Sequence, residues 1–98
     1  MDVNVKIVET DDEKEFVISI RRIVFIQELN IPEHMEIDDN EDLATYVLAK
    51  VEGKNVGTAR WRETNSGIKL ERFAVLNQYR SYGVGTAMTK FILKQLDQ

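Results

Sequence analysis

The centre of the chain is the part that most restricts its fold, because three segments with the character of strands follow one another with only short turns between them. Three strands are predicted, at 43–52, 55–64 and 68–76. The joining pieces, Gly53-Lys54 and Asn65-Ser66-Gly67, carry the Gly and Asn that hairpin turns with positive φ require. Because such short turns connect neighbouring strands, the sequence predicts an antiparallel meander.

One strand and two helices are predicted around the meander. Residues 3–9 alternate with period two and indicate a first strand. Thr10 or the next residue offers an N-cap for a helix whose apolar stripe runs to about Leu29, and a second amphipathic pattern covers 83–96. The acidic segment 33–42 shows no periodicity and is predicted to be a connecting loop. The order strand, helix, three strands, helix indicates an α/β fold of the layered α+β kind, with a mixed, mainly antiparallel sheet of about four strands.

Length and composition limit the classes of protein to consider. With 98 residues the chain has material for a single core, so residues 1–98 are predicted to form one domain. It has no cysteine, which excludes disulfides, thiolate metal sites and a cysteine nucleophile. No basic and apolar leader opens the chain, and no apolar stretch approaches the roughly 20 residues that span a bilayer. We therefore expect a reduced, cytoplasmic, soluble protein without a membrane partner.

The acidic stretch Asp38–Asp42 superficially resembles a calcium-binding loop. A loop of that type needs Gly after its third ligand position, where this chain has Leu43, and it needs a closing Glu that is missing here. We therefore predict no metal site.

Charge is divided unevenly along the chain. Residues 1–42 hold 4 basic and 13 acidic side chains, and residues 43–98 hold 9 basic and 4 acidic ones, so the two parts carry −9 and +5 and sum to −4. A positive half inside an acidic protein predicts a specific anionic ligand, since the acidic half would repel a general polyanion. Chance clustering of charges on a solvated face would give the same numbers.

The last segment of the meander contains a change of phase. Ile68 and Leu70 place apolar side chains on even positions, whereas Phe73 and Val75 place them on odd ones. If both pairs face one core, one residue around Glu71-Arg72 must be extra, which predicts a β-bulge. A bulge splays the strand from its neighbour and frees backbone groups for a ligand. A strand buried on both faces would fit the same pattern.

The segment 77–87, between this strand and the last helix, has the features of an anion site. A helix start offers free backbone N–H groups and a partial positive charge. Gly83 and Gly85 would let phosphate oxygens approach the backbone, and Arg80 adds a planar fork of donors. A Rossmann fingerprint fails at Met88, and the Gly-Lys-Ser/Thr of a P-loop does not occur. In the alternative interpretation the glycines only shape a turn and the arginine is solvated.

In its context this segment resembles motif A of the GNAT N-acetyltransferase superfamily. The stretch Leu70–Arg80, Leu-Glu-Arg-Phe-Ala-Val-Leu-Asn-Gln-Tyr-Arg, is similar to that family's passage from its fourth strand into the acyl-CoA pyrophosphate loop. The resemblance covers nearly the whole chain. It implies an acyl-CoA-dependent N-acyltransferase that moves an acetyl group from acetyl-CoA to a primary amine of a small molecule or peptide.

The resemblance also implies which residues form the site. Acetyl-CoA would lie along the bulged strand and pair with backbone groups of Phe73, Ala74 and Val75. Its pyrophosphate would be held by Arg80, Ser81, Tyr82, Gly83, Val84, Gly85 and Thr86. Glu71, on the bulged strand where an amine would arrive, is the candidate general base, and Glu28 at the end of the first helix could also approach an amine. Glu71 could instead form an ion pair with Arg72 or Arg60, and Glu28 could be solvated.

Members of the family continue beyond the pyrophosphate helix with further strands and a helix, so the chain resembles a truncated member. The further part often supplies a tyrosine that protonates the leaving thiolate, so no general acid is assigned here. An uncovered strand edge predicts self-association into a homo-oligomer. The alternative function is a non-catalytic acyl-CoA-binding or dimerisation module. Nucleic-acid binding is not expected, because the strands lack an aromatic stacking platform.

Overall fold

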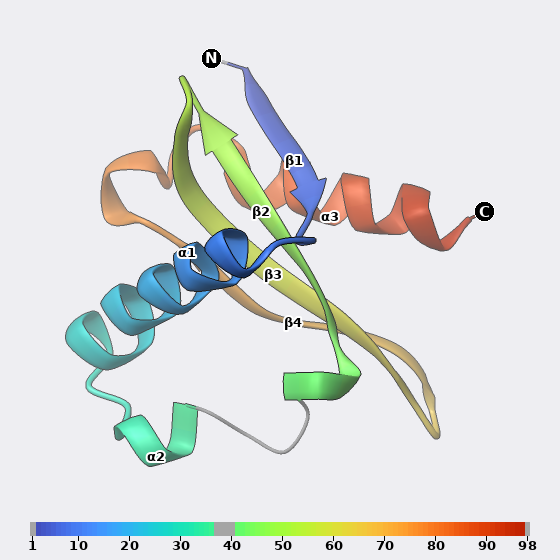
Figure 1. The fold of residues 1–98 in the computed structure, drawn as a ribbon. Helices are drawn as coiled ribbons and strands as arrows, with labels where there is room; N and C mark the ends of the chain where they lie inside the picture. Colours follow the sequence, from blue (N-terminus) through green and yellow to red (C-terminus); the bar gives the residue numbers. More distant parts are fainter. Residues whose placement is uncertain (1, 37–40, 98) are drawn as a thin grey trace.

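The computed structural model describes residues 2–36 and 41–97, and its centre is one four-stranded antiparallel sheet (Figure 1). The strands lie side by side in chain order: β1 (Val3–Ile7), β2 (Thr45–Val51), β3 (Lys54–Thr64) and β4 (Gly67–Val75). The predicted meander is therefore confirmed. The first hairpin turns one residue earlier than expected, at Glu52 and Gly53, whose φ angles are 51° and 80°. Both residues adopt the left-handed region that a two-residue hairpin loop needs.

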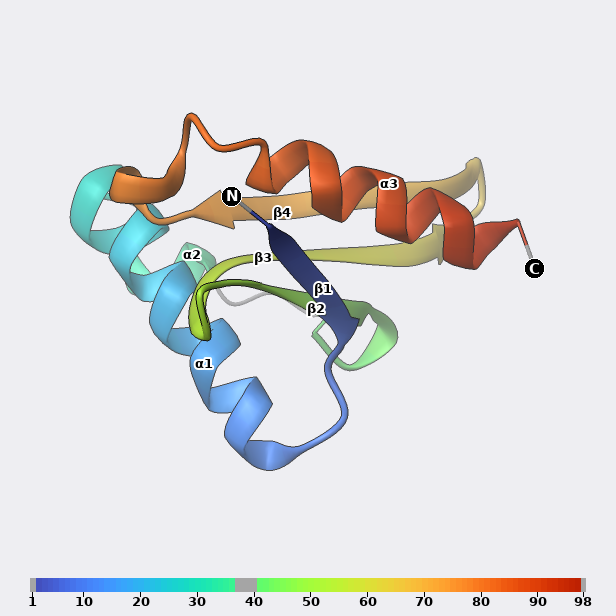
Figure 2. The ribbon, with the colours of Figure 1, turned by 90° about the horizontal axis from the view of Figure 1, so that it is seen from above.

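The two main helices lie on opposite faces of the sheet (Figure 2). On one face α1 (Asp11–Arg21) continues into a π-helical segment, η1 (Arg22–Glu28), and on the other face lies α3 (Val84–Leu96). The segment 33–42, predicted to be a loop, contains one short helical turn, α2 (Glu33–Glu36), and a second, η2 (Glu41–Leu43), begins at its end. Residues 37–40, which hold most of the rejected calcium motif, lie outside the described residues. A third short turn, η3 (Asn77–Tyr79), follows β4. No helix among the described residues is long and apolar enough to cross a membrane.

The start and end of the first helix follow from local chemistry. Thr10, one of the two predicted candidates, is the N-cap: its hydroxyl accepts a hydrogen bond from the Glu13 amide at 3.1 Å, while the Glu13 carboxylate accepts one from the Thr10 amide at 3.0 Å. The expected single helix to Leu29 instead widens at Arg22, and the Leu29 amide donates to the Val24 carbonyl five residues back, at 3.2 Å. Such π-helical turns shift every later side chain around the helix axis.

The sheet is buried on both faces, and each face forms its own core. On the α3 side, β2 and β3 contribute Val47, Ala49, Val51, Val56 and Ala59 to a cluster completed by Val84, Met88 and Ile92. On the α1 side, Val17, Ile20 and Val24 pack against Leu48 and Ala74. The helix α3 crosses the sheet closely at Gly57, where an added Cβ would lie 2.9 Å from a methyl of Val84. Gly57 therefore sets the distance between α3 and the sheet.

The bulge predicted in β4 is present. Thr58 pairs with Ala74 but Arg60 pairs with Glu71, so β4 has one more residue than β3 between these pairs. Arg72, at the irregularity, has a φ of 56°. Because of the extra residue, Leu70 and Phe73 both contact the core on the α3 side despite their odd spacing.

Candidate cofactor-binding and active site

The N-terminus of α3 is open. Gly83 is the N-cap with a φ of 76°, no side chain caps the helix, and the first backbone bond runs from the Ala87 amide to the Gly83 carbonyl at 2.9 Å. The amides of Gly85 and Thr86 therefore have no partner within the helix. A Cβ added at Gly85 would meet nothing within 4 Å. Packing therefore does not explain this glycine, and its amide can be approached from outside.

A groove runs from the bulged strand to this helix start. It is lined by Phe73 of β4 and by Gly85, Thr86, Thr89 and Lys90 of α3. The sequence predicted Phe73, Gly85 and Thr86 but missed Thr89 and Lys90. Both lie one helical turn beyond predicted residues, so the four-residue spacing could have revealed them. The Thr89 hydroxyl donates to the Gly85 carbonyl at 3.0 Å. Lys90 is the cation among the residues that line the groove.

The backbone at the end of β4 alternates between the sheet and its open edge. The Leu76 amide donates to the Val56 carbonyl at 2.9 Å, so Val75 sits in a pair without mutual hydrogen bonds. Its N–H and C=O consequently face away from β3, where the described part of the chain supplies no further strand. Ala74, which pairs with Thr58, points its backbone groups at β3 instead. Of these two predicted backbone contacts, only Val75 lies at the open edge.

Arg80 stands beside this edge but is already engaged. Its Nε donates to the Val75 carbonyl at 2.8 Å, and its Nη2 donates to the Glu28 carboxylate at 2.7 Å. The predicted residues around it differ in exposure: Ser81 and Tyr82 are exposed, whereas the side chain of Val84 is in the core and only its amide can serve a ligand. Glu28, which the sequence suggested could approach the acceptor amine, is therefore the ion-pair partner of Arg80, the residue predicted to bind the pyrophosphate.

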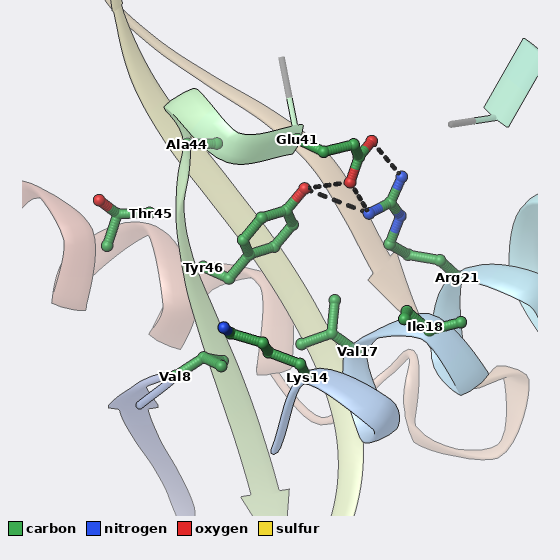
Figure 3. A pocket seen from close by; sticks show the side chains of 9 residues that line it. All are labelled: Val8, Lys14, Val17, Ile18, Arg21, Glu41, Ala44, Thr45 and Tyr46. Atoms are coloured by element: carbon green, nitrogen blue, oxygen red, sulfur yellow. Dashed lines mark hydrogen bonds and ion pairs between the residues drawn. The ribbon is translucent and has the colours of Figure 1, made fainter. Parts of the chain in front are cut away.

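A partly buried network of charged groups lies on the α1 side of the sheet, and Figure 3 shows its Arg21, Glu41 and Tyr46. Arg60 is 0% exposed, and its Nη1 donates to the Tyr46 hydroxyl at 3.0 Å and to the Glu41 carboxylate at 3.3 Å. Arg21 binds the same carboxylate through both terminal nitrogens, at 2.7 and 2.9 Å, and Tyr46 donates to it at 2.6 Å. Desolvation, together with the hydrogen bond to Glu41, raises the pKa of Tyr46. The phenol therefore stays neutral at physiological pH.

Glu71, the candidate general base, belongs to this network. One of its oxygens accepts hydrogen bonds from Arg60 Nε at 2.7 Å and from Arg62 Nε at 2.9 Å. Desolvation alone would raise the pKa of Glu71, but the hydrogen bonds from Arg62 and Arg60 outweigh it and lower the pKa to about 2. A carboxylate this weakly basic is a poor proton acceptor. The structure thus shows the ion pair with Arg60 that the sequence left open, and the role as base stays a prediction.

A second cavity lies between α1 and the start of β2 (Figure 3). Its volume is about 490 Å³, and the Arg21, Glu41 and Tyr46 network forms its polar end. The remaining lining residues are Val8, Lys14, Val17, Ile18, Ala44 and Thr45. The sequence did not reveal this cavity, because no local pattern brings the first helix onto the second strand. Among the described residues, no group of three or more His, Asp or Glu side chains could hold a metal ion.

The bulged edge strand, the open groove and the uncapped helix define an α+β domain that can bind an elongated anionic ligand. A family comparison makes the assignment specific: the acetyltransferase (GNAT) family matches residues 10–98. The chain belongs to the GNAT acetyltransferase family, as the resemblance implied.

Two curated relatives and one solved structure are similar to this chain. The chain is 39% identical over 75 residues to an uncharacterized N-acetyltransferase of Bacillus subtilis, YjcF, a match that covers 76% of this chain and 54% of that protein. It is 34% identical to the uncharacterized protein YyaT of the same organism, over 98% of this chain and 64% of that protein. The crystal structure of Escherichia coli ElaA shares the fold, with a TM-score of 0.80 and 18% identity over 96% of this chain and 69% of that one. The chain spans between half and two thirds of the length of these two Bacillus proteins.

Proposed function

We propose that the chain binds acetyl-CoA and forms the cofactor-binding part of an N-acetyltransferase that acts on a primary amine. The groove between β4 and the start of α3 is the observation that supports this most strongly. It combines unpaired helix amides, a glycine that packing does not require, and a lysine at the second turn. These groups fit a diphosphate, whose oxygens accept hydrogen bonds from amides and whose charge matches a helix N-terminus.

The residues present also fit the rest of such a cofactor. Val75 offers an edge-facing amide to a pantetheine arm, which contains amide groups of its own, while its carbonyl accepts a hydrogen bond from Arg80. Phe73 lines the same groove, and the bulge at Arg72 separates this stretch of β4 from the regular ladder. Acetyl-CoA, when bound, supplies an activated acyl group. The chain's part is to bind and orient it along β4.

Acyl transfer also needs an acceptor amine in its neutral form and a group that takes its proton. Glu71 is the predicted base, and its ion pairs with Arg60 and Arg62 weigh against it. This low basicity favours a second candidate function, a non-catalytic acyl-CoA-binding module. The two functions differ in one measurement: both predict binding of coenzyme A, but only the enzyme releases free thiol from acetyl-CoA when amines are added.

The binding site is tested by titrating coenzyme A calorimetrically. Arg80→Ala removes the guanidinium and Gly85→Val places a branched side chain over the helix amides, and we expect each to weaken binding by about tenfold. Gly85 is better suited than Gly83, because the positive φ of Gly83 would strain any replacement. Lys94→Ala, an exposed cation in the last turn of α3, is the matched control and should bind like the wild type. Absence of coenzyme A binding to the wild type would reject the proposal.

Self-association and a cytoplasmic location remain predictions. The open edge of β4 is the feature that supports self-association. Sedimentation at micromolar concentration measures it directly, and a strict monomer would count against it.

A further inference from the structure

One element, η1, contacts β4 and the loop after it at two separate points. The ring of Phe25 lies under the guanidinium of Arg72 at the bulge, with 6.0 Å between the guanidinium carbon and the ring centroid. Three residues later, Glu28 binds Arg80. The π-helical turn presents both side chains to the same region. Through these contacts η1 touches both β4 and the loop that precedes α3, the two segments along which the cofactor is proposed to bind.

The contacts of Arg80 occupy two groups that a ligand at the start of α3 would use, the Arg80 guanidinium and the Val75 carbonyl. The Nε and Nη2 edge of the guanidinium is shared between the Val75 carbonyl and the Glu28 carboxylate. The same carbonyl faces the open edge of β4, where a pantetheine arm would bind. Both groups therefore already have partners within the protein: the Arg80 guanidinium binds the Glu28 carboxylate, and the Val75 carbonyl accepts from Arg80.

We propose that Glu28 is an internal competitor for the anion at the start of α3, and that a bound diphosphate displaces its carboxylate from Arg80. This inference rests on the proposed function, since it names a regulator of the same site. In the closed state Glu28 neutralises Arg80 and holds it against β4. In the open state Arg80 turns its donors to the phosphate and releases the Val75 carbonyl.

Exposure and charge explain why this exchange can run in both directions. The side chains of Arg80 and Glu28 are 43% and 31% exposed, so water competes for their ion pair and keeps it weak. A diphosphate carries more charge than one carboxylate and also binds the helix amides, which Glu28 does not contact among the described residues. A ligand with a single negative charge lacks both advantages. Glu28 should therefore make the site at the start of α3 selective for a diphosphate.

The test compares coenzyme A affinity in wild type and Glu28→Gln by calorimetry at low salt. Removing the competing charge should raise the affinity about two- to fivefold, the range of an exposed ion pair. The gain should disappear in the Arg80→Ala background, because Glu28 then has no cation to hold. Glu33→Gln is the matched control: it removes the same charge from a nearby exposed carboxylate whose partner is Arg22, and it should leave the affinity unchanged.

The results separate this inference from the proposed function. If neither wild type nor Glu28→Gln binds coenzyme A, the proposed function is rejected, and the inference about Glu28 is rejected too because it rests on that function. If wild type binds but Glu28→Gln binds equally or more weakly, the function stands and the competitor is rejected, because Glu28 then only positions Arg80 or plays no part. A gain that persists without Arg80, or that Glu33→Gln reproduces, would also overturn it by showing a general charge effect.

Discussion

Two arginines of this protein have opposite surroundings. Arg60 is completely buried under the first helix, where Glu41, Tyr46 and Glu71 accept its hydrogen bonds. Arg80 is 43% exposed at the edge of the sheet, with Glu28 and one carbonyl as its partners. The same chemical group can therefore support the fold in one place and, at the exposed edge, be proposed to bind a ligand in another. The number of partners and the access of water distinguish the two cases.

The comparison also accounts for the uneven charge along the sequence. Ion pairs join the acidic first part to the basic second part, from Glu41 to Arg60 and from Glu28 to Arg80. Part of the positive charge that suggested an anionic ligand is thus neutralised internally. The cations at the proposed site are Lys90 and, when Glu28 releases it, Arg80.

The largest expected effect comes from removing the buried arginine. Arg60→Met should lower the free energy of unfolding by about 3 kcal/mol, because two carboxylates lose a buried partner. Arg80→Met should lower it by no more than about 1 kcal/mol, since its pair is exposed. Urea unfolding followed by circular dichroism measures both. Equal losses in the two variants would remove the distinction between a structural and a ligand-binding arginine.

Glu71→Gln is expected to cost about 2 kcal/mol at neutral pH, since Arg60 and Arg62 lose a charged acceptor. The pKa of Glu71 is lowered from 4.5 to about 2 in the folded state, so its stabilising effect is complete above about pH 4.5 and is lost as the pH falls towards 2. The stability difference between wild type and variant should therefore shrink over this range. Unfolding measured from pH 6 to pH 2 tests this.

The same variant tests the predicted role as base. A base would show as a large loss of kcat with unchanged affinity for coenzyme A, and with a changed pH profile. An ion-pair partner would show as a loss of stability with thiol release retained. The second result is the one we expect.

A smaller effect should separate two glycines that look alike in the sequence. Gly57→Ala should destabilise the protein by about 1 to 2 kcal/mol, because its Cβ would lie 2.9 Å from Val84. Gly85→Ala should leave stability unchanged or raise it by up to about 1 kcal/mol, because the space is open and alanine favours a helix. Thermal unfolding compares them. A destabilising Gly85→Ala would mean that packing, and not a ligand, requires this glycine.

Lys90→Gln should have the smallest effect. Lys90 is exposed on the groove, so its loss should weaken coenzyme A binding about two- to threefold at low salt, and the difference should fade as salt is added. Lys94→Gln, one turn further along α3, controls for the change in net charge. Equal effects of the two substitutions would place Lys90 outside the binding site.

Much of the fold could be predicted because its signals are local. The hairpin residues, the Thr10 cap and the apolar period of α3 each act over a few neighbouring residues, and they predicted the two hairpins, the first helix start and the last helix, with the first turn displaced by one residue. The bulge was one of two interpretations that the change of phase between Leu70 and Phe73 allowed, and only the register of β4 against β3 shows it. The change to a π-helix at Arg22 was not predictable from the apolar pattern, because the same stripe fits an uninterrupted α-helix.

The amino-acid sequence alone determined the order of strands and helices and the glycine-rich start of the last helix, since each depends on backbone preferences over short stretches. Only the tertiary structure decided which charges meet. Glu28 and Arg80 are 52 positions apart, and Arg60 and Glu41 are 19 apart. Ion pairing depends on which surfaces packing brings together and how far water is excluded from them, and neither is written in any local pattern.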